Sequence, residues 1–315
     1  MCIAVFMWQS HPLYPFLLLL NRDEYHTRPT EPAGWWEGGE ILGGRDELGG
    51  GTWLACSRGG RIAFLTNFRE KESLPGAKSR GNLPVRFVES RKDPSEFAEE
   101  VIQEAEQYNG FNLVLTDICS KSMVYVTNRP KNNKPYGFQV SPGIHVLTSA
   151  SLDSRWPKAE RLLQNFKELM NTYGEGEVRA NEMVQKLMRD TTKADKSPLP
   201  GIYSLEFEYQ LSSIYIEATD TPLGLYGTRS TSAVLVKANG DICFHEWYLV
   251  DDIWKEHVIT YQINKGDTQS DKLRVPLFEF DHFDAPRQSQ MLKKECIRLL
   301  NRQMLQWLTV VHYKP

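Results

Sequence analysis

The residues best suited to chemistry are a cysteine at the start of the chain and a charged cluster at the end of an apolar run. Cys2 directly follows the initiator methionine, and the leucines at 17–20 lead into Asn21-Arg22-Asp23. A small second residue permits removal of the methionine, which would leave Cys2 with a free α-amino group. That amine, with an ordinary pKa of about 8, can act as general base for the adjacent thiol. The pattern favours an N-terminal nucleophile, and the alternative is a small apolar core residue.

Two short apolar runs predict how this cluster reaches the cysteine. The segments CIAVFMW and YPFLLLL are separated by residues 9–12 (QSHP), whose composition is typical of a turn, so they predict a β-hairpin. Antiparallel pairing would place the end of the second strand beside the start of the first. Asp23 would then accept from the α-ammonium group, and Arg22 would lower the pKa of the thiol. A solvated ion pair that ends the strand is the alternative.

The rest of the chain alternates groups of strands with helices. Strands are predicted at 50–57, 60–68, 111–117, 122–128, 212–218, 232–238 and 241–250, and helices at 94–108, 156–173 and 177–190. The glycine-rich stretch 41–51 (ILGGRDELGGG) lacks the pattern of a phosphate-binding loop and is interpreted as turn structure. This order predicts the α+β class, as a four-layer αββα sandwich with helices outside two β-layers.

A change of composition near residue 265 predicts where the main domain ends. Residues 1–265 are expected to form the αββα domain, and residues 266–315 an appended polar segment followed by an amphipathic helix at 290–308. That helix mixes leucines and a tryptophan with lysines and arginines. It could pack on the domain, form a dimer or make peripheral contact with an anionic membrane.

Composition and charge argue against several classes of protein. The net charge of −3, without a cluster of Lys and Arg among aromatics, predicts no nucleic-acid partner. No apolar run approaches the roughly 18 residues of a membrane span, so no transmembrane segment is predicted. The 5 cysteines are scattered without C-x-x-C spacing, which fits a reducing compartment, and the 7 histidines show no metal-binding pattern. We therefore predict a cytoplasmic protein without a metal site.

Several motifs together resemble one known family. They are Cys2, NRDEYHTRP at 21–29, GGTWLA at 50–55, GRIAFLTNFRE at 60–70, SRGNLP at 79–84, YNGFNLVL at 108–115, RWPKAE at 155–160, LPGIYS at 199–204 and YGTRSTS at 226–232. In this order they resemble the NRDE family, which is the transport and Golgi organisation protein 2 family. The resemblance covers residues 1–265.

That family is in turn similar to N-terminal-nucleophile hydrolases of the choloylglycine hydrolase and penicillin V acylase type, which share an αββα fold. The resemblance implies that Cys2 attacks the substrate, Asp23 holds the amine, and Arg22 and Arg229 polarise the site. The backbone amide of Asn67 would receive the developing oxyanion. Asn21, Glu24, Trp53, Thr148 and Ser149 are expected to line the ligand pocket.

One position departs from the hydrolase pattern. The segment at 146–150 reads VLTSA, with Ser149 where the hydrolases carry a second oxyanion-hole asparagine. Loss of one oxyanion donor can cost about a hundredfold in rate. This departure favours a protein that binds rather than cleaves its ligand.

Three classes of function are open, the first two implied by the resemblance and the third suggested by the appended segment alone. The first is a carrier of a hydrophobic small molecule in haem trafficking or in lipid and acyl-CoA homeostasis, with links to Golgi organisation and secretion. No cofactor would be required, haem being a candidate cargo, and the location would be cytoplasmic with mitochondrial or Golgi association. The second is a cysteine hydrolase that cleaves linear amides, acyl esters or thioesters through an acyl-enzyme at Cys2. The third is a scaffold of the secretory pathway.

Overall fold

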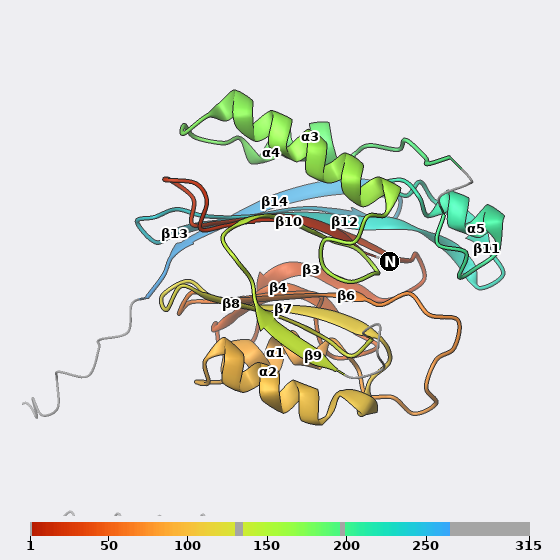
Figure 1. Cartoon of the computed structure of the whole chain (residues 1–315), viewed down its shortest axis with the longest axis horizontal. Helices are drawn as coiled ribbons and strands as arrows, with labels where there is room; N and C mark the ends of the chain where they lie inside the picture. Colours follow the sequence, from red (N-terminus) through yellow and green to blue (C-terminus); the bar gives the residue numbers. More distant parts are fainter. Residues whose placement is uncertain (1, 130–134, 196–198, 265–315) are drawn as a thin grey trace, which may run out of the picture. The chain divides into compact units, whose positions relative to one another are not determined.

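Short apolar strands, with turn residues between them, build two sheets that lie face to face. The computed structural model describes residues 2–129, 135–195 and 199–264. Within these residues two seven-stranded sheets form the inner layers, and helices cover the outer face of each (Figure 1). This is the four-layer αββα sandwich of the α+β class, so the sequence prediction of the fold is confirmed.

The first sheet carries the start of the chain in its middle. Its order is β10-β1-β2-β12-β13-β14, with β11 paired to β12, and every neighbouring pair is antiparallel. The strands span Ile3–Trp8 (β1), Phe16–Tyr25 (β2), Gly143–Leu147 (β10), Thr219–Thr221 (β11), Gly224–Val236 (β12), Asp241–Val250 (β13) and Ile253–Gln262 (β14). The predicted hairpin of the first two strands is confirmed.

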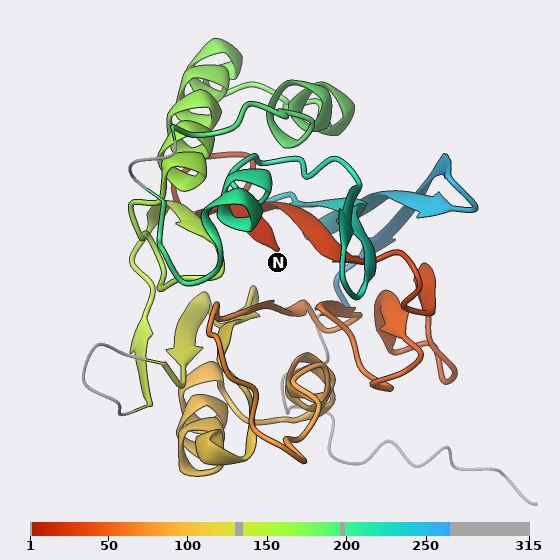
Figure 2. The ribbon, with the colours of Figure 1, turned by 90° about the vertical axis from the view of Figure 1, so that its right-hand side faces the viewer.

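The second sheet is a meander whose strands follow one another in chain order. Its strands span Thr30–Trp35 (β3), Ile41–Asp46 (β4), Leu54–Ser57 (β5), Arg61–Asn67 (β6), Phe111–Asp117 (β7), Ser122–Thr127 (β8) and Tyr136–Gln139 (β9). Figure 2 views the sandwich from the end at which β1 begins and β2 and β6 finish.

Amphipathic helices complete the outer layers. The helices are Asn82–Glu89 (α1), Pro94–Gln103 (α2) with the 3₁₀ turn Ala105–Gln107 (η1), Pro157–Tyr173 (α3), Ala180–Met183 (α4) with the π turn Val184–Met188 (η2), and Leu205–Gln210 (α5). Helices α1 and α2 pack on the second sheet, and α3 packs on the first. The apolar stripe of α3, with Leu162 and Phe166, is buried against Val5 and Leu19.

Alternation along the strands sorts their side chains between the two layers. In β2, Leu18 and Leu20 belong to the core between the sheets. Leu17 and Leu19 belong to the layer beneath α3. Even-numbered positions of β2 therefore face the other sheet, and odd-numbered positions face the helices.

Several sequence predictions of elements are wrong. Residues 41–51 are not all turn, because β4 runs through Gly43 and Gly44. A Cβ at Gly44 would lie 2.4 Å from the ring of Trp53, so the close approach of that indole explains a glycine inside a strand. Residues 212–218 form no strand, and the helix predicted at 177–190 is only α4 and a π turn. Elements α1, α5, β3, β9, β10 and β14 were not predicted.

The described residues belong to one compact unit, which spans Met1–Gly266. The segment at 266–315, with its predicted amphipathic helix, lies outside the described residues, so its appended character stays a prediction.

Candidate active site

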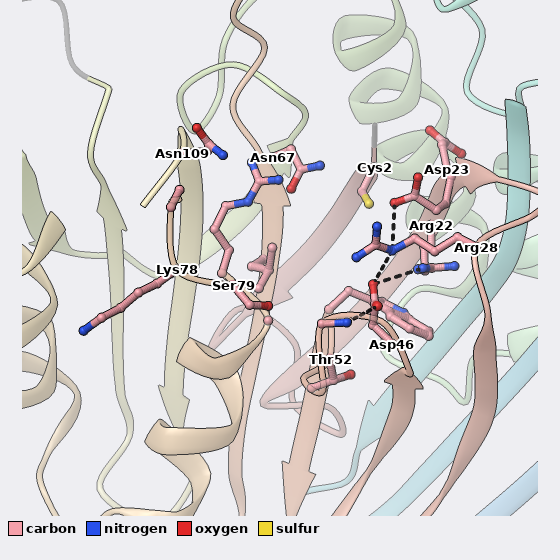
Figure 3. Close-up of a pocket in the computed structure, with 17 residues that line it drawn as sticks. Cys2, Arg22, Asp23, Arg28, Asp46, Thr52, Asn67, Lys78, Ser79 and Asn109 are labelled. Atoms are coloured by element: carbon pink, nitrogen blue, oxygen red, sulfur yellow. Dashed lines mark hydrogen bonds and ion pairs between the residues drawn. The ribbon is translucent and has the colours of Figure 1, made fainter. Parts of the chain in front are cut away.

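A cavity of about 310 Å³ opens at the end of the sandwich where β1 begins. Its lining comes from the first sheet, the second sheet and the loop that leads into α1. The first sheet contributes Cys2, Arg22, Asp23 and Glu24, the second sheet and its turns contribute Asp46, Trp53, Leu65 and Asn67, and the loop contributes residues 77–81. Figure 3 shows Cys2 between Asn67 on one side and Arg22 and Asp23 on the other.

Cys2 enters the cavity one residue before β1. The register pairs Ile3 with Asn21, and its continuation places Cys2 opposite Arg22. The residue is 8% exposed, and burial raises the pKa of its thiol, although the positive amino terminus opposes this rise. The thiol is therefore protonated at neutral pH and needs a base before it can attack.

Arg22 occupies an even position of β2 and faces the second sheet. Its guanidinium lies 4.3 Å from the ring centroid of Trp53 and 3.7 Å from the Asp46 carboxylate. Asp46 also accepts from Nε of Arg28 at 2.6 Å. Stacking and ion pairing hold this buried cation in place, where its charge favours the thiolate of Cys2.

Asp23 reaches the same cavity from the odd face of β2. Its Oδ1 accepts from the Thr228 hydroxyl at 2.7 Å, and its backbone carbonyl accepts from the Tyr226 hydroxyl at 3.1 Å. Burial raises the pKa of this carboxyl, while the amino terminus and Lys158 lower it. The charge of Asp23 is thus favoured by two cationic groups, and its role of holding an amine stays a prediction.

Asn67 ends β6 and lines the cavity across from Arg22. Glu24 and Trp53, two of the predicted pocket residues, also line it. The structure therefore brings together Cys2, Arg22, Asp23 and Asn67, as the resemblance implies.

Arg229, the fifth predicted catalytic residue, is not among the residues that line the Cys2 cavity. It lies in β12 where the pairing with β2 shifts register, between Thr228 and Ser230. Its Nη1 donates to the backbone carbonyls of Tyr25, at 3.2 Å, and Arg28, at 2.5 Å. The side chain therefore binds the backbone that follows β2, and its role as a polarising residue stays a prediction.

Asn21, Thr148 and Ser149, which were also predicted to line the ligand pocket, are not among the residues that line the Cys2 cavity. Asn21 occupies an odd position of β2, where its amide donates to the carbonyls of Met188, at 2.9 Å, and Ile214, at 3.0 Å. It is completely buried and contributes to the fold.

Thr148 and Ser149 follow β10 and bind through their backbones. The Thr148 carbonyl accepts from the hydroxyl of Thr66 at 2.6 Å, and the Ser149 carbonyl accepts from the amide of Arg69 at 2.8 Å. Among the described residues, the buried Ser149 hydroxyl has no hydrogen-bond partner. These contacts join the two sheets at the end that holds the cavity.

Sequence reasoning missed a group of charged residues around this end. Arg80 and Lys78 line the cavity, and Lys158 is buried beneath it with the ion pair of Arg69 and Glu208. The available signal for Lys158 was its place on the apolar stripe of α3, since positions 158, 162 and 166 share one face.

Neither a metal site nor a membrane-spanning helix is found in the part of the chain that the structure describes. No group of three or more His, Cys, Asp and Glu side chains within residues 2–129, 135–195 and 199–264 could hold a metal ion. No helix of the same residues is long and apolar enough to cross a membrane.

The four-layer αββα sandwich, with a cysteine just before its first strand, is a fold like that of N-terminal-nucleophile hydrolases. The family model for Transport and Golgi organisation 2 matches residues 1–251. The chain therefore belongs to the Transport and Golgi organisation 2 family.

Relatives of the family match most of the chain. The Transport and Golgi organization 2 homolog of Mus musculus is 30% identical over 263 residues, which is 80% of this chain and 94% of that protein. The homolog of Homo sapiens has the same identity and coverage, and the protein of Drosophila melanogaster is 26% identical over 271 residues, 78% of this chain and 91% of its own length.

Two solved structures are also similar. A C2A mutant of the conjugated bile acid hydrolase from Clostridium perfringens has a TM-score of 0.38 and 13% identity, over 83% of this chain and 97% of the other. A Caenorhabditis elegans orthologue of N-acylethanolamine-hydrolyzing acid amidase has a TM-score of 0.36 and 13% identity, over 74% of this chain and 92% of the other.

Proposed function

We propose that the protein is a cysteine hydrolase that cleaves a linear amide, ester or thioester through an acyl-enzyme at Cys2. The observation that carries this proposal is the meeting of Cys2, Arg22, Asp23 and Asn67 in one cavity. Those four side chains come from the residue before β1, from β2 and from β6, and they supply a nucleophile, a cation, an anion and a polar group.

The mechanism begins with removal of Met1. This cleavage exposes the α-amino group of Cys2, which becomes the amino terminus of the chain. The neutral amine takes the thiol proton, and sulfur attacks the substrate carbonyl while the carbonyl electron pair moves to oxygen. The backbone amide of Asn67 then stabilises that oxyanion. On collapse the bond to the leaving group breaks, and the leaving group takes a proton from the ammonium. Water, deprotonated by the same amine, then attacks the acyl carbonyl. The thioester bond breaks, the acid is released, and the Cys2 thiolate takes the proton back from the ammonium.

The lining of the cavity bears on the substrate. A volume of about 310 Å³ is at the lower end of the range for ligand sites, about 300–1,000 Å³. Its charged lining consists of the cations Arg22, Arg28, Lys78 and Arg80 and the anions Asp23, Glu24 and Asp46. Such a lining suits the polar, reacting end of a substrate, with any apolar chain extending beyond the cavity.

The second candidate is a carrier of a hydrophobic molecule such as haem, a lipid or acyl-CoA. Ser149, in place of the second oxyanion-hole asparagine, favours it. A second cavity of about 520 Å³ also favours it, with Tyr14, Leu235 and Ile242 in its lining. The names of the relatives link them to transport and Golgi organisation, so this function would accompany a cytoplasmic location with Golgi or mitochondrial association.

Intact-protein mass spectrometry separates the two candidates. The processed protein would be incubated with a panel of acyl amides, esters and thioesters, and the adduct would be mapped by peptide digestion. We expect an acyl group on Cys2, with turnover reduced at least about a thousandfold in Cys2→Ala. Cys119→Ser is the matched control, because Cys119 is exposed and distant in the fold from the cavity lining.

The alternative outcome is equally specific. If the mass confirms a chain that starts at Cys2 and no acyl group attaches, the hydrolase proposal is rejected. Haem and acyl-CoA titrations of the wild type and Cys2→Ala would then test the carrier, whose affinity should be the same in both.

A further inference from the structure

Lys158 is a lysine in a position where lysines are rarely found. It lies in the first turn of α3, is 3% exposed, and its Nζ donates to the carbonyl of Ser213 at 3.3 Å. Burial of an ammonium group is costly unless an anion lies close by. The site therefore needs a carboxylate that compensates this charge.

The segment that binds Lys158 also binds the hydroxyl that holds Asp23. The backbone amide of Ile216 donates to Oγ1 of Thr228 at 2.9 Å, and that hydroxyl donates to Oδ1 of Asp23 at 2.7 Å. Ser213 and Ile216 are three residues apart along this segment. Asp23 and Lys158 are thus anchored near one another on the helix-facing side of β2.

Other nearby charges already have partners. Arg69 pairs with Glu208 at 2.5 Å, and both side chains are almost fully buried. Arg161, one turn along α3 from Lys158, pairs with Asp190 at 2.8 Å. These two carboxylates contact arginines, whereas the charge of the Asp23 carboxylate opposes the fall in the pKa of Lys158.

The charges that face the two groups agree with this assignment. Burial lowers the pKa of Lys158 to about 8, with Asp23 and Cys2 opposing the fall and Arg69 and Arg161 adding to it. For Asp23, burial raises the pKa, and the amino terminus and Lys158 are the cations that oppose the rise, whereas Glu24 adds to it. Each group is thus among the principal electrostatic neighbours of the other.

This arrangement matters for an N-terminal base. The amine of a processed Cys2 must be neutral to take the thiol proton, whereas a carboxylate beside it favours the ammonium form. A second cation on the same carboxylate offsets that preference and also favours the thiolate.

We infer that Lys158 is a positioning residue whose ammonium group compensates the Asp23 carboxylate and leaves the amino group of processed Cys2 free to act as base. The inference rests on the proposed function for its catalytic meaning. The charge relation itself can be measured without any substrate.

The test is the pH dependence of Cys2 alkylation by iodoacetamide, followed by peptide mass mapping in the processed full-length protein. Lys158→Met should shift the midpoint of the rate profile upward by about one pH unit or more, because a cation that favours the thiolate is lost. Lys158→Arg should restore the wild-type midpoint. Lys186→Met is the matched control, since Lys186 is exposed and pairs with Glu182 at 2.7 Å.

An unchanged midpoint in folded Lys158→Met overturns the inference, even if the wild type hydrolyses an acyl substrate. A shift supports it, even if no substrate is found. Should Lys158→Met fail to fold, the ¹³Cε signal of Lys158 in labelled Asp23→Asn supplies the measurement. Its titration should move to lower pH by about one unit when the carboxylate is neutralised, and an unmoved titration rejects the inference.

Discussion

The motif at residues 21–24 serves both the cavity and the fold, because its side chains alternate between the two faces of β2. Arg22 and Glu24 face the second sheet and line the cavity with Trp53. Asn21 turns to the helix layer, where it binds backbone carbonyls and is completely buried. Asp23 shares that odd face but lies at the cavity's edge.

The difference shows that adjacency in a motif does not mean a shared role. Strand alternation sends neighbouring residues into different layers, so one stretch can both secure the fold and supply the site. Variants of Asn21 should therefore reduce stability, and variants of Arg22 should alter the reactivity of Cys2.

The largest expected effect is on the helix-facing side. Asn21→Leu keeps a side chain of similar size but leaves the carbonyls of Met188 and Ile214 and the hydroxyl of Thr231 without that partner. Each buried polar group left unsatisfied costs about 1–3 kcal/mol, so the free energy of unfolding should fall by about 4 kcal/mol. Urea denaturation followed by circular dichroism measures it.

Asn181→Leu is the control for this prediction, because Asn181 is exposed in α4 and should change stability little. Equal stability of Asn21→Leu and the wild type would contradict the division of the two faces.

A smaller effect, and one that depends on pH, is expected from Glu246 of β13. Its Oε2 accepts from the amide of Ala33 at 2.6 Å, and burial raises the pKa of this carboxyl to about 7, with Arg22 and Ser230 opposing the rise. The folded state thus binds a proton that the unfolded state releases above its ordinary pKa of about 4.5. Stability should therefore fall as pH rises from about 4.5 to 7, by about 3 kcal/mol in total.

Glu246→Gln removes this titration, so its advantage in unfolding free energy over the wild type should grow across that pH range. Urea denaturation at a series of pH values measures the difference. Glu256→Gln, on the neighbouring strand with a largely exposed side chain, should leave the pH dependence unchanged. A constant difference between Glu246→Gln and wild type at all pH values would be evidence against the buried proton.

The sequence was sufficient for the hairpin that forms the site. Two apolar runs and a short turn fix the pairing of β1 with β2, and the pairing alone brings Arg22 opposite Cys2. The second sheet was harder, because β4 contains glycines that resemble a turn. Their reason lies in tertiary packing, where Trp53 crosses the strand too closely for a side chain.

Side-chain direction was the main feature that the sequence did not reveal. The motif alone does not say which residues of 21–24 face the cavity, and the register shift beside Arg229 alters the alternation in β12. Lys158 comes from a helix distant along the chain, and its relation to Asp23 depends on an irregular segment that was predicted to be a strand.

The sharpest comparison uses two arginines that share one carboxylate. Arg22 lies 3.7 Å from Asp46, and Nε of Arg28 lies 2.6 Å from it, but only Arg22 is buried next to Cys2. Arg22 is among the charges that lower the pKa of the Cys2 thiol, so Arg22→Met should slow alkylation at neutral pH by about tenfold. Arg28→Met should slow it much less, because its side chain is about a third exposed and water screens its charge. If both variants lose reactivity equally, the loss comes from the contact with Asp46 that the two arginines share. Arg22 would then affect Cys2 by keeping the cavity rigid, and its charge would not be the cause.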